Sequence, residues 1–153
     1  MLVAYIDGGS RGNPGPAGYG VRIEEPDGTV HAELRGALGT VTNNVAEYRG
    51  LIAALTFLVD TGRRQVLVKS DSQLLVRQMR GEYRVRHPGL RRLHQEASAL
   101  VTQLEQTRFE HVPRASNTEA DRLANLAMDE AEAEAEAETE AKADPSHPSG
   151  KSQ

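Results

Sequence analysis

Short apolar runs bounded by turn residues indicate where this chain forms strands. Residues 2–7 form an apolar run that ends in Asp-Gly-Gly, which is typical of a buried strand followed by a turn. Residues 18–25 and 29–38 flank Pro-Asp-Gly, a sequence that favours a hairpin. Residues 65–71 and 107–112 predict two further strands. The pattern therefore predicts five strands.

Apolar residues spaced by three and four predict the helices that separate these strands. The spacing predicts a long helix at residues 44–60, a short helix ending at Met79, a second long helix between Leu90 and Leu104, and a last helix opening at Ser116. A meander of three strands followed by crossover helices predicts an α/β fold, with a mixed sheet and helices on its faces.

The charge of the chain divides its 153 residues into two parts. Residues 129–153 carry eight acids and two lysines, a net charge of −6, whereas residues 1–128 carry sixteen basic and fourteen acidic residues, a net charge of +2. We expect one domain at residues 1–128. Residues 129–153 are interpreted as an acidic Ala/Glu-rich tail or linker, helical at first and disordered from Asp144.

An arginine cluster raises the question of nucleic-acid binding. Six arginines lie between Arg77 and Arg92, opposed only by Glu82. The overall pI of 5.7 argues against such binding, whereas the local cluster argues for it. A solvated arginine-rich face explains the cluster equally well, so charge alone leaves both interpretations open.

Composition argues against several classes of protein. No apolar run approaches the ~20 residues of a membrane helix, and the first residues show no secretory signal. Because the chain has no cysteine, it has neither a disulfide framework nor a thiolate metal site. We expect a cytoplasmic monomer without membrane contact.

Four carboxylates stand where side chains leave the predicted scaffold. Asp7 and Asp71 end strands, Glu47 lies in the first turn of the first long helix, and Asp121 lies early in the last helix. Ligands gather at strand ends in α/β sheets, and hard cations such as Mg²⁺ prefer carboxylate oxygens. Four acids in one place would also repel one another, which gives a reason to expect a metal.

Each carboxylate has a structural explanation as well. Asp7 precedes Gly-Gly and suits a turn. Glu47 and Asp71 suit helix caps, and Asp121 suits a surface position favoured by the helix dipole, so that only all four acids together favour a site. The candidate capping groups are Asn44 with Glu47, Asp71 before a helix from Ser72, and Ser116 with Glu119 near Asp121.

Four segments resemble the four blocks of type 1 ribonuclease H, in the same order and at similar intervals. They are DGGSRGNPGPAGYG at 7–20, TNNVAEYRGLIAAL at 42–55, VKSDSQLLVRQMRG at 68–81 and ASNTEADRLANLA at 115–127. The resemblance is specific because each block carries one of the four carboxylates. It implies a ribonuclease H-like fold, with a five-stranded mixed sheet flanked by helices. The form is short, since the basic Trp-containing protrusion of many family members is absent.

The resemblance also implies an activity. The family hydrolyses the RNA strand of RNA–DNA hybrids as an endoribonuclease, by two-metal-ion catalysis, leaving 5′-phosphate and 3′-hydroxyl ends. Two Mg²⁺ ions, with Mn²⁺ as an alternative, would be held by the four catalytic carboxylates. These metal ligands are Asp7, Glu47, Asp71 and Asp121.

Hybrid-binding residues follow from the same resemblance. Amides are suited to the minor groove because each offers a donor and an acceptor, although helix capping also explains Asn43 and Asn44, and a turn explains Asn13. The matching amides are Asn13, Asn43, Asn44 and Gln73. Small residues at Gly9, Ser10 and Gly12 would bring backbone close to the RNA strand. Thr42 and Arg86 match a pocket for a DNA phosphate, in which His87 replaces an amide.

The loop before Asp121 departs from the family pattern. Family members often carry a mobile His there in a glycine-containing loop, whereas this chain reads HVPRASN at 111–117. His111 ends a strand and is expected to point inward. Arg114 is predicted to act near the leaving group by electrostatics and not as a proton donor.

Two other functions compete with hybrid cleavage, and some relatives suggest one additional domain. A catalytically silent hybrid-binding module would have lost a carboxylate, and none is lost. A DNA resolvase or exonuclease on the same fold would lack the Gly-Asn-Pro-Gly loop and the paired asparagines, which are both present. Some relatives join this domain to a phosphatase-like domain, so a fused second domain beyond the tail is a further expectation.

Overall fold

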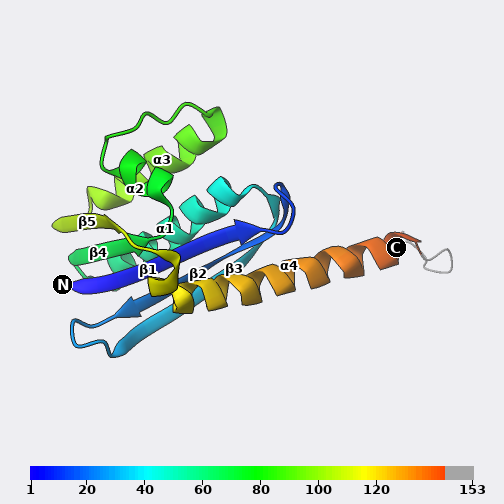
Figure 1. Cartoon of the computed structure of the whole chain (residues 1–153), viewed down its shortest axis with the longest axis horizontal. Coiled ribbons are helices and arrows are strands. Elements are labelled where there is room, and N and C mark those ends of the chain that lie inside the picture. The colour runs from blue at the N-terminus through cyan, green and yellow to red at the C-terminus, as the bar shows by residue number, and fades with distance from the viewer. Residues whose placement is uncertain (144–153) are drawn as a thin grey trace.

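The computed structural model describes residues 1–143 and contains a five-stranded mixed sheet in the order β3-β2-β1-β4-β5 (Figure 1). The central strand β1 pairs antiparallel with β2 and parallel with β4, which pairs parallel with β5. The predicted fold class and order of elements are confirmed, and the tail from Asp144 lies outside the described residues. The strands are β1 (Leu2–Ser10), β2 (Gly15–Glu24), β3 (Val30–Val41), β4 (Gln65–Ser70) and β5 (Gln106–His111).

Helices cover both faces of the sheet. Helix α1 lies on one face and α4 on the other, and α3 packs against α1 (Figure 1). No helix in the described part of the chain is long and apolar enough to cross a membrane. The helices are α1 (Asn43–Asp60), α2 (Gln73–Met79), α3 (Pro88–Val101), the short 3-10 helix η1 (Arg114–Ser116) and α4 (Thr118–Ala143).

Strand β1 is longer than its apolar run predicts. The sequence interpretation placed a turn after Asp7, but β1 continues to Ser10 because its antiparallel pairing with β2 runs on as far as Ser10 opposite Ala17. The parallel pairing with β4 stops earlier, at Ile6 opposite Ser70. Asp7 is therefore held within a strand on one side and is free of pairing on the other.

Glycines allow both helices to lie directly on the central strands. A Cβ atom at Gly8 would overlap the backbone of Ala46 in α1, and one at Gly20 would overlap the backbone of Ala120 in α4. At Gly18, a Cβ atom would lie 2.5 Å from the Cβ of Ala127, which is also in α4. The helices that carry Glu47 and Asp121 are thus set close to β1 and β2.

The helix caps differ from those predicted. The Thr42 hydroxyl caps α1 by accepting from the Val45 N–H at 3.3 Å, and the Ser72 hydroxyl caps α2 by accepting from the Leu75 N–H at 3.3 Å. Helix α4 begins after Asn117, whose carbonyl accepts from the Asp121 N–H at 3.1 Å. The predicted capping roles of Asn44, Asp71 and Ser116 are therefore wrong.

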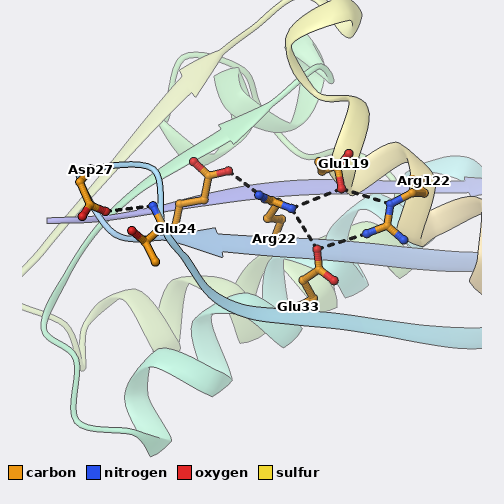
Figure 2. Close-up of polar contacts among 7 residues, drawn as sticks. Arg22, Glu24, Asp27, Glu33, Glu119 and Arg122 are labelled. Atoms are coloured by element: carbon orange, nitrogen blue, oxygen red, sulfur yellow. Dashed lines mark hydrogen bonds and ion pairs between the residues drawn. The ribbon is translucent and has the colours of Figure 1, made fainter.

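An ion-pair network holds the first turns of α4 against the sheet (Figure 2). Arg22 of β2 contacts Glu33 of β3 at 3.1 Å and Glu119 of α4 at 3.3 Å, and its Nε pairs with Glu24 at 2.8 Å. Arg122 contacts the same two partners, Glu33 at 3.2 Å and Glu119 at 3.1 Å. These partly exposed charges share their partners, which makes the network more effective than isolated pairs.

We predict that Gly20→Ala destabilises the protein by about 1–3 kcal/mol, because the added methyl group must displace helix backbone rather than a flexible side chain. Thermal unfolding should show a Tm lower by roughly 2–10 °C. Gly9→Ala is a suitable control, since the nearest atom to its Cβ is the terminal methyl of Met128 at 3.3 Å. Equal losses in the two variants would contradict the close-packing argument.

Candidate active site

The four predicted carboxylates line one pocket of about 700 Å³ at the end of the sheet where the parallel pairing stops. Each acid comes from a different element, so the pocket exists only in the assembled fold. They are Asp7 of β1, Glu47 of α1, Asp71 directly after β4, and Asp121 of α4.

Strand register places the two aspartates of the sheet. Ile6 lies opposite Ser70 in the last parallel pair, so Asp7 and Asp71 are the next residues on adjacent strands. Because both strands run in the same direction, both carboxylates emerge at the same edge. The sequence prediction that Asp7 and Asp71 lie together is confirmed, although Asp7 does not end its strand.

The helical carboxylates are placed by helix contacts with β1 and β2. Glu47 is the fifth residue of α1 and not in its first turn, and its backbone lies against Gly8. Asp121 is the fourth residue of α4. Just before α4, the buried Asn117 side chain donates to the Ile6 carbonyl at 2.9 Å, which ties the start of the helix to β1 beside Asp7.

Burial and like charge act together on Asp7. Burial raises the pKa of Asp7 to about 8, with further increases from the carboxylates of Asp71 and Asp121 and from a hydrogen bond with Asp121. Without a cation, Asp7 thus holds a proton at neutral pH. A group with a pKa raised this far in a pocket is a candidate for a functional role.

The other two perturbed acids have neighbours that partly compensate for burial. Burial raises the pKa of Glu47 to about 7, although a hydrogen bond with the Ser72 side chain lowers it. Burial also raises the pKa of Asp71, whereas the positive charge of Arg114 lowers it. Arg114 therefore lies close enough to act on a charge in the pocket.

The donor chemistry of the pocket fits a hard divalent cation. Within residues 1–143, no three acidic or histidine side chains already form a metal-binding cluster. The pocket nevertheless concentrates carboxylate oxygens, which are the ligands that Mg²⁺ prefers. A cation would favour the charged forms whose pKa values burial and repulsion raise. The residues that would hold it are Asp7, Glu47, Asp71 and Asp121.

Four of the nine predicted substrate-binding positions lie around this pocket. Gly9, Ser10, Asn43 and Asn44 line it together with Arg114. The Ser10 N–H donates to Asn43 Oδ1 at 2.7 Å, which joins the end of β1 to the start of α1. The amide of Asn43 therefore has a structural partner in addition to its place at the pocket.

The remaining predicted positions do not line the pocket. Asn13 Oδ1 accepts from the Asn43 N–H at 3.0 Å, so this residue supports the rim, as Thr42 does by capping α1. Gln73 and Arg86 are exposed. Gly12 has a φ of 84°, a conformation that favours glycine. His87, at the same loop as Arg86, caps α3 through a hydrogen bond from the Gly89 N–H at 3.1 Å.

Three further pocket residues with polar side chains are absent from the predicted site. Ser72 was assigned only to the start of a helix, yet its side chain contacts Glu47. His111 was expected to point inward, but it is exposed at the pocket. His111 pairs with Ser70 in the sheet, and Ser70 directly precedes Asp71, so this pairing brings His111 to the pocket. Asn125 lies one helical turn after Asp121, and its side chain donates to the Asp121 carbonyl at 2.9 Å.

Comparisons with known proteins agree with this arrangement. The sequence model of the reverse transcriptase-like family matches residues 5–127. The bifunctional protein Rv2228c of Mycobacterium tuberculosis is 54% identical over 131 residues, which are 85% of this chain and 36% of the relative. Ribonuclease HI of Halobacterium salinarum is 45% identical over 84% of this chain and 64% of its own length. The chain thus spans about a third of the mycobacterial relative.

Solved structures match over most of the chain. The N-terminal ribonuclease H domain of Rv2228c superposes with a TM-score of 0.85 at 53% identity, covering 88% of this chain and 97% of that structure. Ribonuclease H1 of H. salinarum gives 0.81 at 44% identity, over 84% and 98% of the two chains. LC11 ribonuclease H1, solved in complex with an RNA/DNA hybrid, gives 0.82 at 41% identity, over 86% and 99%. These similarities show that the chain belongs to the ribonuclease H1 family.

Proposed function

We propose that this protein is an endoribonuclease that hydrolyses the RNA strand of RNA–DNA hybrids. The observation that carries the proposal is the convergence of Asp7, Glu47, Asp71 and Asp121 in one pocket. A relative at 41% identity, LC11 ribonuclease H1, was solved with an RNA/DNA hybrid, which supports the substrate class.

The four carboxylates are proposed to hold two Mg²⁺ ions, with Mn²⁺ as a substitute. Bound at this pocket, the cations would supply Lewis-acid activation of water and neutralise charge at the scissile phosphate. Asp7 has the carboxylates of Asp71 and Asp121 as charged neighbours and would hold the cations together with them. We expect products with 5′-phosphate and 3′-hydroxyl ends.

The remaining pocket residues suit binding and charge compensation. Gly9, Ser10 and the amide of Asn44 line the pocket beside the carboxylates, and the Asn44 amide offers both a donor and an acceptor, which fits recognition of a 2′-hydroxyl. Arg114, which acts on Asp71, is proposed to stabilise negative charge near the leaving group without donating a proton. The exposed Arg86 is proposed to contact a phosphate of the DNA strand.

A second activity on the same polypeptide is a separate proposal. The mycobacterial relative is named bifunctional and is matched over only 36% of its length. A fused domain following the acidic helix would agree with that name.

We predict that Asp7→Asn reduces hybrid cleavage at least about 100-fold, because losing one charged group from a metal clamp is worth several kcal/mol. The assay follows a labelled RNA–DNA hybrid with Mg²⁺ or Mn²⁺, beside duplex RNA and duplex DNA. Asp27→Asn is the matched control, since Asp27 lies in the exposed turn between β2 and β3. The proposal fails if the protein binds the hybrid without cutting it, or if Asp7→Asn cuts as fast as the control.

Metal-free stability should depend on pH through Asp7. Its pKa in the folded state is about 8, against 3.8 for an ordinary aspartate, so the folded protein binds the proton more tightly than the unfolded chain does. Stability is therefore lost as pH rises from about 4 to about 8. An asparagine at this position carries no charge at any pH, so Asp7→Asn should be more stable than the wild type at pH 8, by about 1–3 kcal/mol, and equal to it near pH 4.

The measurement is thermal unfolding in EDTA at both pH values, followed by titration with Mg²⁺. Mg²⁺ should raise the Tm of the wild type more than that of Asp7→Asn, since a ligand stabilises the state that binds it. A constant difference between the two proteins across this pH range would argue against a buried, proton-binding Asp7.

A further inference from the structure

Arg11 lies in the connection between β1 and β2, and its side chain contacts the middle of α4. One terminal nitrogen of its guanidinium donates to Asp129 at 2.6 Å and to Glu132. The other donates to the side-chain oxygen of Asn125 at 3.2 Å and to its carbonyl at 3.4 Å. Both terminal nitrogens of the guanidinium are therefore engaged by acceptors from one helix.

These contacts continue to the candidate active site. Asn125 accepts from Arg11 and donates to the carbonyl of Asp121 at 2.9 Å, and it lines the same pocket as the four carboxylates. Arg11 is thus separated from the backbone of Asp121 by one side chain.

The connection containing Arg11 is held from its other side by α1. Ser10 and Asn13 are hydrogen-bonded to Asn43 at 2.7 and 3.0 Å, and the Arg11 N–H closes the connection on the Pro16 carbonyl at 2.9 Å. A Cβ atom at Gly15 would overlap the Arg11 carbonyl, so the connection is already tightly folded. The connection is therefore held to α1 by the hydrogen bonds with Asn43 and to α4 by the side chain of Arg11.

We propose that Arg11 is a positioning residue that, with Asp129 and Glu132, locks residues 11–14 to α4. This lock fixes the position of the substrate-binding rim (Gly9, Ser10, Asn43 and Asn44) relative to Asp121. This inference rests on the proposed function, because it concerns how that site presents a hybrid. Asp129 and Glu132 lie beyond residues 5–127, the part matched by the family model. Residues 129–132, the first turn of the acidic tail, therefore have a proposed role in positioning the site.

Positioning explains the contacts better than phosphate binding does. A guanidinium free to bind a phosphate needs open donors, whereas those of Arg11 face two carboxylates and two oxygens of Asn125. Two acids also exceed its single positive charge, so the cluster would repel a nucleic-acid backbone. The contacts of Arg11 join a short connection to a helix, so they restrict movement of the connection relative to that helix.

The test compares two variants with the same change in charge. Asp129→Asn with Glu132→Gln neutralises both acidic partners of Arg11 and leaves Asn125 in place. Glu130→Gln with Glu134→Gln neutralises two neighbouring acids of α4 that do not contact Arg11. The first readout is amide hydrogen exchange of residues 10–16 without nucleic acid. We expect exchange about tenfold faster in the first variant only, equivalent to about 1.4 kcal/mol of lost protection.

The second readout is hybrid cleavage under saturating Mg²⁺. The first variant should raise KM for the hybrid about tenfold with kcat changed less than about twofold, because the rim is loosened while the carboxylates stay in place. Arg11→Ala should do the same, and Arg11→Lys should recover part of the loss because it retains one ion pair.

Three results would overturn the lock: equal exchange in the two acid variants, equal KM values, or a lower KM in the first variant, which would identify Arg11 as a phosphate ligand restrained by the acids. If the wild type cuts no hybrid, the proposed function fails, and the exchange experiment still decides whether the lock exists.

Discussion

The close approach of two helices to two glycine-containing strands is the constraint on which the rest of this structure depends. Gly8 admits α1 to β1, and Gly18 and Gly20 admit α4 to β2. A side chain at any of these positions would hold a helix away from the sheet by the thickness of a methyl group or more. Glu47 and Asp121 would then recede from Asp7 and Asp71, although every local element could still form.

The four acids repel one another when they are brought together, and the residues around the pocket reduce this repulsion. Asp7 and Glu47 have pKa values of about 8 and 7, so part of the repulsion is avoided by holding protons. The cationic Arg114 opposes the effect of burial on Asp71. Around α4, Arg22 and Arg122 bind Glu33 and Glu119, which fixes the helix by charges that do not enter the pocket.

The order of elements and the four acids could be predicted from the sequence, because periodic apolar positions and short motifs both leave patterns within a few neighbouring residues. The sequence could not identify the N-cap of α1, because Thr42, Asn43 and Asn44 are all good capping residues. Moving the first residue of the helix by two positions leaves its apolar pattern unchanged. Asp-Gly-Gly suggested a turn because glycine favours turns, yet the pairing partner of β1 decided otherwise. Arg11 and Asp129 are 118 residues apart, and no local pattern links two surface charges over that distance.

The pocket draws its four carboxylates from parts of the chain that are far apart in the sequence, so the site proposed to bind metal ions exists only when the tertiary structure is complete. A chain emerging during synthesis, or one opened by partial unfolding, carries the acids but scatters them. The proposed nuclease activity would therefore require the folded chain, and a misfolded copy would lack the assembled site.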